Sequence, residues 1–404
     1  MREPRSVDPV NAVLNGRPAP FVPVAPVYEG LGPLECYEME LRRRKWWRRL
    51  EEAGRERLPV EFESYAALEL EIHTDMLDEH YPRPAWRELP IIASAEDLDG
   101  CAVVRRGEDL FWVARDGRET WLPTSLAARN QREVVEGAAR FAGLWERGWR
   151  GEQAEVPGGD VRESVGEPTD ADVEGLLRSG RYEVARALLG RHPGEMPLYC
   201  YGVTPYWSLL ATLGFQRMMT WLAERPRRVH EIIASRALRW SAELEAARRL
   251  GVGIAFVEEC MASADLISPK MYREFVFPYT KQVLECYEAH GLRTVLYFSG
   301  NLMPLLEDLR ELPWTALAFE EDRKNYGIDL GEVRRTMGPH RVVFGNVDAY
   351  LIERASDAEV VSEVRRQIDV AGGDGPFIVS PGSPFTPGTS LRRVRLFCES
   401  TRLV

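Results

Sequence analysis

The chain has 404 residues, of which 45% are hydrophobic and 28% charged, so it is not disordered and has enough apolar residues to bury a large core. The formal net charge of −11 repels phosphate backbones, and no apolar run approaches the roughly 20 residues that span a bilayer, so we expect neither a nucleic-acid partner nor a membrane partner. The six cysteines are scattered without a CxxC pair or an export signal, which favours a reducing cytoplasm.

The first elements in chain order are a strand and a helix. Residues 21–28 (FVPVAPVY) predict a strand that glycine and proline turns flank, and residues 34–53 predict a helix. Within this helix the basic run 42–49 contains Trp46 and Trp47 and is flanked by glutamates. We interpret the run as a solvated helix face whose tryptophans pack inward.

The next segment fits either a strand or a helix, and we expect an insertion after it. Residues 68–74 (LELEIHT) alternate well enough for a second strand, but a helix over 65–77 competes, and His73 is interpreted as a hydrogen-bonded structural residue. Residues 101–123 contain strand-like stretches with glycine turns, which predicts hairpins. We expect one domain over 1–404, with an insertion over 95–168 that ends in an exposed loop.

From residue 171 the pattern becomes regular. Helices are predicted over 171–192, 205–223 and 226–250, with a strand at 197–203 between the first two. Five strand–helix repeats follow, with strands at 252–259, 294–300, 316–321, 342–348 and 376–382 and helices beginning near residues 268, 302, 329, 357 and 389. Eight strands in all predict an α/β fold, a (β/α)8 TIM barrel with an N-terminal extension and a β-hairpin insertion. A doubly wound open sheet is the rival, but no Gly-x-Gly-x-x-Gly turn follows any of these strands.

Polar side chains end the predicted strands, where a barrel carries its active site. Two strands end in acid pairs, Glu258-Glu259 and Glu320-Glu321. Because successive strand residues face opposite sides, one carboxylate of each pair is expected in the barrel mouth, where paired acids share a proton or bind a cation. The alternative is that each pair caps a loop or pairs with an arginine.

The loop after the eighth strand is also a candidate site. Residues 380–389 (SPGSPFTPGT) lead to the start of a helix, where backbone N–H groups bind anions. Ordinary turn chemistry of proline and glycine explains the same composition.

Residues 251–279 (GVGIAFVEECMASADLISPKMYREFVFPY) resemble the uroporphyrinogen decarboxylase superfamily, in which a strand ending in acids precedes an "SP..Y.EF..PY" helix start. The similarity continues through the segments 10–27, 296–302 (LYFSGNL), 328–338, 342–348 (VVFGNVD) and 378–384 (IVSPGSP). The resemblance implies a barrel and two chemistries, which are porphyrinogen decarboxylation and methyl transfer to or from a corrinoid or a thiol.

Two departures from that superfamily narrow the expectation. Its decarboxylases hold substrate carboxylates with arginines after the first strand, where this chain has Tyr28-Glu29-Gly30. Its cobalamin-linked methyltransferases bind zinc through His-x-Cys-Gly-Asn and a further Cys, which are replaced here by Tyr297, Ser299 and Ser383. Hydroxyls are poor zinc ligands, so zinc is in doubt and metal binding stays open.

We therefore expect a methyltransferase that moves a methyl group from a small methylated or methoxylated substrate to a corrinoid protein. The chain has no Asp-x-His-x-x-Gly motif, so the corrinoid is expected on a separate partner, and a homodimer is possible. The candidate catalytic residues are Glu259, Glu320 and the hydrogen-bond donor Tyr297. The candidate substrate-binding residues are Tyr28, Glu258, Ser299, Asn301, Asp348 and Ser383. A small-acid decarboxylase or lyase and a non-catalytic ligand-binding barrel are the alternatives.

Overall fold

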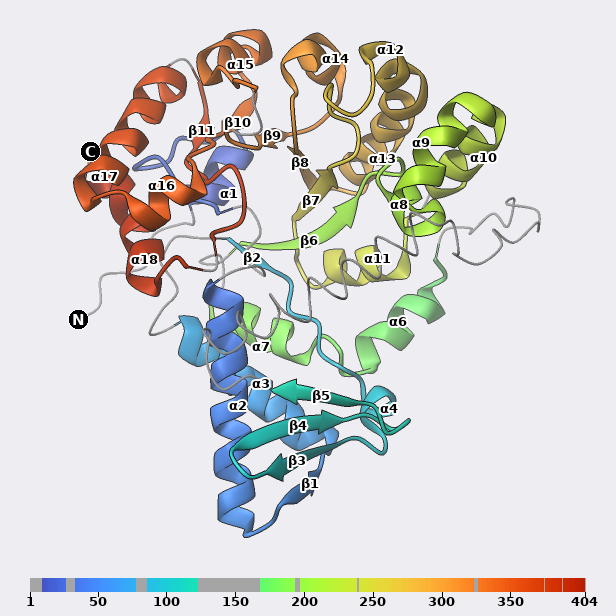
Figure 1. The fold of residues 1–404 in the computed structure, drawn as a ribbon, viewed down its shortest axis with the longest axis vertical. Coiled ribbons are helices and arrows are strands. Elements are labelled where there is room, and N and C mark those ends of the chain that lie inside the picture. Colours follow the sequence, from blue (N-terminus) through green and yellow to red (C-terminus); the bar gives the residue numbers. More distant parts are fainter. Residues whose placement is uncertain are drawn as a thin grey trace.

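The computed structural model describes residues 9–26, 33–77, 86–122, 168–192, 197–237, 240–322, 326–373, 375–386 and 388–403. Its centre is a curled parallel sheet of seven strands in the order β11-β10-β9-β8-β7-β6-β2, with helices around it (Figure 1). The strands are β2 (Arg87–Glu88), β6 (Leu198–Val203), β7 (Ile254–Glu259), β8 (Arg293–Phe298), β9 (Ala316–Phe319), β10 (Val342–Phe344) and β11 (Phe377–Ile378). Strands β6 to β11 confirm six predicted strands.

The predicted second strand is wrong. Residues 68–74 belong to helix α3 (Phe62–Asp75), as the competing helical interpretation held. Leu68 and Ile72 are fully buried and lie four residues apart, so the apolar residues also fit one face of a helix. The strand at this place in the sheet is β2, which pairs with β6.

The N-terminal segment contacts both edges of the parallel sheet. Val24 forms a parallel bridge with Val379, which follows β11, and the Ala25 N–H donates to the Val379 carbonyl at 2.9 Å. The indole N–H of Trp86, which precedes β2, donates to the Pro26 carbonyl at 2.8 Å. The described part of the predicted first strand, 21–26, therefore lies between the two edge strands.

Three predicted helices are each divided into two. Gly180, with φ of +82°, separates α6 (Asp170–Arg178) from α7 (Glu183–Arg191), and Gly214, with φ of +69°, separates α8 (Ser208–Leu213) from α9 (Phe215–Glu224). These glycines adopt a left-handed conformation that other residues disfavour. The third predicted helix becomes α10 (Pro226–Ala237) and α11 (Ala242–Arg249), because Ser241 caps a new start.

The remaining helices follow their strands and begin near the predicted residues. Side chains of Ser268, Asp329, Ser356 and Ser390 accept backbone N–H groups at four of these starts. The elements are α1 (Pro9–Leu14), α12 (Pro269–Met271), η2 (Tyr272–Val276), α13 (Phe277–Ala289), η3 (Met303–Leu305), α14 (Leu306–Glu311), α15 (Leu330–Met337), α16 (Ala349–Arg354), α17 (Asp357–Gln367), η4 (Ile368–Gly372), α18 (Leu391–Glu399) and η5 (Ser400–Arg402). None of the described helices is long and apolar enough to cross a membrane.

A second, antiparallel sheet packs with α2 and α3 at the lower end of Figure 1. Its order is β1-β3-β4-β5, and the predicted hairpins are present. As predicted, Trp46 on α2 is buried, but the basic run 42–49 is not solvated throughout, because Lys45 is buried as well. The elements are α2 (Pro33–Ala53), β1 (Arg57–Pro59), α4 (Ala95–Leu98), β3 (Ala102–Arg106), β4 (Asp109–Val113) and β5 (Glu119–Leu122). The insertion bounds stay a prediction, and 123–167 lie outside the described residues.

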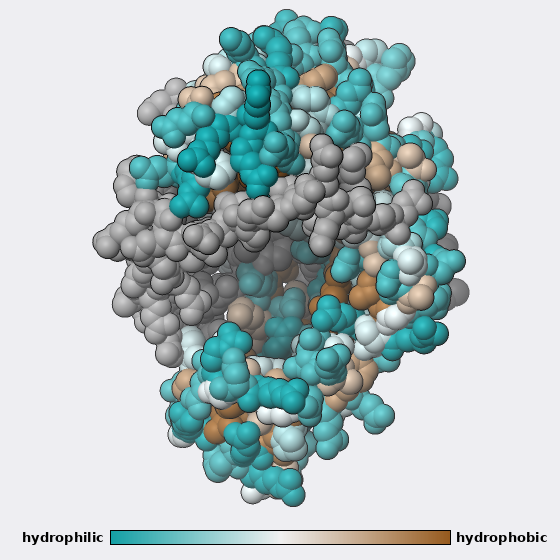
Figure 2. Space-filling view, turned by 90° about the vertical axis from the view of Figure 1, so that its right-hand side faces the viewer, coloured by the Kyte–Doolittle hydropathy of each residue, from teal (hydrophilic) through white to brown (hydrophobic). Residues whose placement is uncertain are grey.

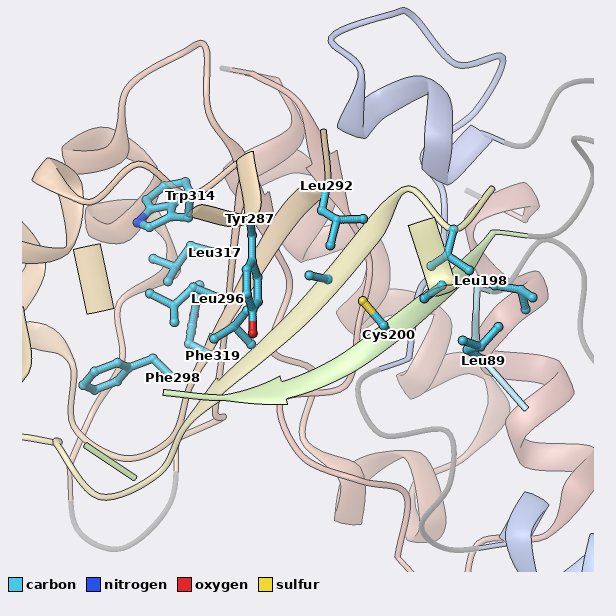
Figure 3. Close-up of a cluster of buried hydrophobic side chains, with 14 of the residues drawn as sticks. Leu89, Leu198, Cys200, Tyr287, Leu292, Leu296, Phe298, Trp314, Leu317 and Phe319 are labelled. Atoms are coloured by element: carbon cyan, nitrogen blue, oxygen red, sulfur yellow. The ribbon is translucent and has the colours of Figure 1, made fainter. Parts of the chain in front are cut away.

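Buried apolar side chains form two clusters on the two faces of the parallel sheet. The outer cluster lies between strands and helices, and Figure 3 shows members such as Leu198, Phe298 and Leu317. The inner cluster fills the space that the sheet curls around, where the Trp86 ring lies 4.7 Å from that of Tyr199 and 5.4 Å from that of Phe344. The interior is thus a packed core on which a polar layer can rest.

Candidate active site

Strand alternation decides which polar side chains reach the interior of the curled sheet. Successive strand residues face opposite sides; accordingly, Phe256 and Tyr297 belong to the inner cluster, whereas Val257 and Phe298 belong to the outer one. Beyond the inner cluster, each strand carries an inward polar residue near its C-terminal end. We call these residues the mouth ring: Glu88, Tyr201, Glu258, Ser299, Glu320, Asn346 and Ser380.

Glu258 is the inward carboxyl of the first acid pair. The Tyr201 hydroxyl donates to one of its oxygens, and the Cys260 thiol donates to the other at 2.8 Å. Burial raises the pKa of Glu258, and the Cys260 hydrogen bond opposes the rise. The same side chain therefore accepts hydrogen bonds and retains its proton to higher pH than an exposed glutamate.

Glu259 faces the opposite side. Its carboxyl accepts the Thr204 hydroxyl and, at 2.8 Å, the Met261 backbone N–H, so it anchors the loop after β7. Burial raises its pKa to about 7. In this pair, strand alternation places Glu258 on the inner side of the sheet and Glu259 on the outer side, whereas the prediction of one inward carboxyl in each pair stays a prediction for the second pair. Geometry thus moves the catalytic proposal from Glu259 to Glu258.

Glu320 is the first carboxyl of the second pair. Its Oε2 accepts the Ser299 hydroxyl at 3.1 Å, the Gly300 N–H at 2.8 Å and the Tyr326 hydroxyl at 2.9 Å. These donors from the loops after β8 and β9 fix the carboxylate orientation. The Asn346 amide donates to the Glu320 carbonyl at 3.4 Å, which ties β10 to the same place.

Two predicted site residues hold the loop after β11 against the sheet. The Tyr297 hydroxyl donates to the Gly382 carbonyl at 2.8 Å, and Ser383 donates to the carboxyl of Glu321, the second member of that acid pair, at 2.6 Å. A Cβ at Gly382 would meet the Glu321 nitrogen at 2.3 Å, so only glycine permits this approach. The Gly382 N–H donates to the Val347 carbonyl at 3.0 Å. This N–H of the predicted anion-binding loop therefore takes part in a backbone hydrogen bond of the fold.

The other predicted residues lie at loop starts. Asn301 accepts the Met303 N–H at 3.1 Å, and Asp348 caps α16 by accepting the Tyr350 N–H at 2.7 Å. Both contacts shape loops beside the ring, and substrate binding by these two residues stays a prediction. Tyr28 lies outside the described residues.

The three positions that replace zinc ligands do not fit zinc. Tyr297 donates to Gly382, Ser299 to Glu320 and Ser383 to Glu321, so every hydroxyl already serves a protein acceptor. Neutral hydroxyls also lack the affinity of thiolate or imidazole for zinc. No metal-assisted step is therefore built on these residues.

Sequence reasoning missed a second charged group, between α2, α3 and β2. We call Glu38, Arg42, Glu69, His73 and Arg87 the arginine cluster. Arg42 donates to both oxygens of Glu69, at 2.8 and 2.7 Å, and to Glu38 at 2.8 Å. It lines a cavity of about 220 Å³ that Glu88 of the mouth ring also lines.

Three side chains of the arginine cluster are spaced like the ligands of a metal ion, but their hydrogen bonds do not suit metal binding. Oxygen and nitrogen atoms of Glu38, Glu69 and His73 lie within 4.8 Å of one another. Arg87 donates to His73 Nδ1 at 2.6 Å, so Nδ1 accepts and Nε2 carries the hydrogen of the neutral ring. Burial, and then Arg87, lower the pKa of His73 to about 3. As predicted, His73 is a hydrogen-bonded structural residue.

A hollow separates the two parts of the molecule. Figure 2 shows it between the upper part, which holds the parallel sheet, and the lower part, which holds α2, α3 and the antiparallel sheet. Glu88 and Tyr201 are exposed although they lie on strands of the parallel sheet, and Tyr201 retains 40% of its exposure. Two members of the mouth ring, Glu88 and Tyr201, are therefore accessible to solvent, whereas Glu258 and Glu320 are buried.

Comparisons with known proteins agree on the family of folds. A family model described as uroporphyrinogen decarboxylase (URO-D) matches residues 176–403. A methylated-thiol–coenzyme M methyltransferase of Methanosarcina mazei is 23% identical over 214 residues, 52% of this chain and 54% of that protein. A uroporphyrinogen decarboxylase of Gloeobacter violaceus is 24% identical over 140 residues, 34% of this chain and 38% of that protein.

The chain thus spans about half, or less, of the length of the curated relatives it matches. A solved structure, a methyltransferase from Methanosarcina mazei, covers 98% of this chain and 97% of its own, with a TM-score of 0.55 and 18% identity. That likeness shows a shared fold. The matched family segment includes β6 to β11 and thus every mouth-ring residue except Glu88.

Proposed function

The chain belongs to the uroporphyrinogen decarboxylase (URO-D) family, and on that premise we propose that it is a methyltransferase that moves a methyl group from a small methylated or methoxylated substrate to a corrinoid protein. Methyltransferases and decarboxylases are both among its relatives. The choice between them rests on the site, because a fold alone does not fix a reaction.

The charge of the mouth ring carries the choice. Its described members include the carboxyls of Glu88, Glu258 and Glu320 and no arginine, lysine or histidine. A substrate with several carboxylates would be repelled there, since like charges in a partly desolvated site strongly disfavour each other. A small donor without carboxylates meets no such penalty, which supports methyl transfer over porphyrinogen decarboxylation.

The ring residues have distinct parts in this proposal. Glu258, whose pKa burial raises, holds or releases a proton at the departing atom of the donor. Tyr201 and Cys260 orient its carboxyl through their hydrogen bonds. Glu320, fixed by Ser299, Gly300 and Tyr326, orients the donor across the ring.

The acceptor is assigned to a partner protein. A reduced corrinoid supplies the nucleophile that accepts the methyl group, and the absence of an Asp-x-His-x-x-Gly motif from this sequence supports its being carried by another chain. This chain's own residues bind the donor and exclude water from it. A homodimer and a cytoplasmic location stay predictions.

We also infer that residues 21–26 close the sheet into an eight-stranded barrel. The bridge from Val24 to Val379 and the hydrogen bond from Trp86 to Pro26 support closure, because they reach opposite edges of the sheet. Slow amide exchange at Ala25 and Val379 is the expected result, and rapid exchange at both would contradict closure.

The test is an anaerobic assay of methyl transfer from a panel of methoxylated and N-methylated compounds to cob(I)alamin, followed by absorbance. We expect at least one active donor, with activity lost in Glu258→Gln and Glu320→Gln and retained in Glu259→Gln, the outward neighbour. Release of carbon dioxide from uroporphyrinogen, without methyl transfer from any donor, would overturn the proposal in favour of a decarboxylase. Binding of a donor without turnover by either route would instead favour a non-catalytic barrel.

A further inference from the structure

We propose that the methyl donor is a methylated ammonium cation, held by the ring face of Tyr201 and the carboxylates of Glu88, Glu258 and Glu320. This names the substrate class of the site and rests on the proposed function. Two kinds of group carry it, an exposed aromatic face and several carboxyls on the same layer of the sheet.

Tyr201 is placed as an open aromatic wall. It lies on β6 near the C-terminal end and retains 40% exposure, because β7 continues past it on one side whereas β2 ends opposite Tyr199 on the other. One side of its ring stacks on Phe256 at a centroid distance of 6.3 Å and an interplanar angle of 21°. The ring is thus supported from below by the inner cluster while a substantial part of it stays accessible, as in sites that bind methylated ammonium groups.

The carboxyls around this ring favour a cation. Glu258 accepts the Tyr201 hydroxyl, and Glu88 lies near enough to Tyr201 to contribute, after burial and Cys260, to raising the pKa of that phenol to about 12. Burial, and then Glu38, raise the pKa of Glu88 although its side chain is exposed, as expected on the wall of a hollow. A bound cation would lower the free energy of each ionised carboxyl.

A second aromatic–carboxyl pair lies further round the ring. The Tyr326 hydroxyl donates to Glu320 at 2.9 Å, much as Tyr201 donates to Glu258. Glu258 on β7 is in register with Tyr297 on β8, and Ser299, two residues beyond Tyr297, donates to Glu320. The two pairs therefore lie on neighbouring strands at the same end of the sheet.

The transfer step balances without a metal ion on this chain. The N–CH3 bond breaks and its electron pair stays on nitrogen, which leaves as a neutral amine. The methyl carbon would form its new bond with the reduced corrinoid of the partner protein, whose cobalt electron pair would make that bond. An ammonium nitrogen needs no added proton, because its positive charge already makes the amine a leaving group. On this donor Glu258 therefore acts through its negative charge, whereas a neutral ether would need its proton.

The first test compares choline with 3,3-dimethylbutan-1-ol, which has the same shape without the charge, by isothermal titration calorimetry of the full-length protein. We expect choline to bind at least about 10-fold more tightly at low ionic strength, with the difference falling as salt screens the carboxylates. Equal affinities for the two compounds would overturn the inference.

Variants separate the ring face from the hydroxyl. Tyr201→Ala is expected to weaken choline binding about 10-fold, whereas Tyr201→Phe keeps the ring and most of the affinity. The matched control is Tyr350→Ala on α16, because Tyr350 is similarly exposed at 43%. Its ring is already covered by Arg354, whose guanidinium carbon lies 4.5 Å from the ring centroid. Equal effects of Tyr201→Ala and Tyr350→Ala would contradict the role of Tyr201.

The design stays decisive if Tyr201→Ala does not fold. Glu258→Gln retains shape and is expected to weaken choline, but not its neutral isostere; equal effects on both would count against the inference. Failure of the proposed function is distinguishable: choline binding without methyl transfer would leave the cation site standing, whereas methyl transfer from a neutral ether without choline binding would remove it.

Discussion

The mouth ring and the arginine cluster contain the same acidic residue type in opposite settings. In the arginine cluster, Glu69 is 2% exposed, and Arg42 donates hydrogen bonds to both of its carboxylate oxygens. Arg87 donates a hydrogen bond to His73. In the mouth ring, Glu258 accepts from a hydroxyl and a thiol, and Glu320 accepts from two hydroxyls and a backbone N–H. The two groups meet at Glu88, which belongs to the ring and lines the cavity of the cluster.

The difference teaches what each set of carboxyls is suited to do. A buried carboxylate with a bidentate arginine is held in one charge state and one orientation, which joins α2 to α3. A carboxyl with neutral donors keeps both its protonation and its charge available to a ligand. The cluster is therefore interpreted as structural and the ring as functional.

The largest effect is expected from the ring itself. Glu258→Gln removes the inward carboxyl and should lower the rate of methyl transfer about 1,000-fold, within the range for loss of an acid–base group. Thermal unfolding should change little, because glutamine still accepts from Tyr201. A variant that keeps full activity, measured as cob(I)alamin methylation, would remove Glu258 from the mechanism.

The second-largest expected effect is a loss of unfolding free energy when an arginine of the arginine cluster is removed. Arg42→Ala leaves the carboxylate of Glu69 buried without its bidentate partner, which should cost about 4 kcal/mol of unfolding free energy in urea denaturation. Arg44→Ala is the control on the same helix, because Arg44 is 59% exposed and pairs with Glu40, and it should cost less than about 1 kcal/mol. Equal costs would mean that burial does not distinguish the two pairs.

A third effect is expected in the pH dependence of stability, and it comes from Glu259, the outward neighbour of Glu258. Burial raises its pKa to about 7 from an ordinary 4.5, so between these values the native state binds more protons than the unfolded state. Unfolding free energy should therefore fall by about 3 kcal/mol as pH rises from 4.5 to 7. Glu259→Gln should flatten this part of the stability profile, and an unchanged slope would assign it to other groups.

The sequence predicted the parallel strands better than the faces of those strands. Apolar runs such as IAFVEE in β7 reveal a strand with both faces buried, but they do not show which residues point inward. The parity that separates Glu258 from Glu259 became readable only once the inner and outer clusters were seen. For the same reason the sequence LYCYGV of β6 does not show that Tyr201 lies on the inner side of the sheet.

Short and non-local features lay beyond the sequence pattern. Strand β2 is only Arg87–Glu88, too short for an alternation signal, and residues 68–74 took its place in the prediction. The arginine cluster joins α2, α3 and β2, so its contacts span 27 positions between Arg42 and Glu69 and 49 positions between Glu38 and Arg87. Only tertiary packing brings such residues together, and no local spacing in the sequence predicts these contacts.

The smallest expected effect is the change in melting temperature on addition of zinc. Although Glu38, Glu69 and His73 lie within 4.8 Å, Arg42 holds both carboxylates and Arg87 fixes the histidine proton on Nε2, so a cation must displace two arginines before it binds. A ligand that binds the native state raises the melting temperature, and added zinc should therefore raise it by less than about 1 °C. Differential scanning fluorimetry measures this, with His73→Gln as the matched control. A rise of several degrees that His73→Gln abolishes would make the cluster a metal site, and the contrast between the two sets of carboxyls would then need a different explanation.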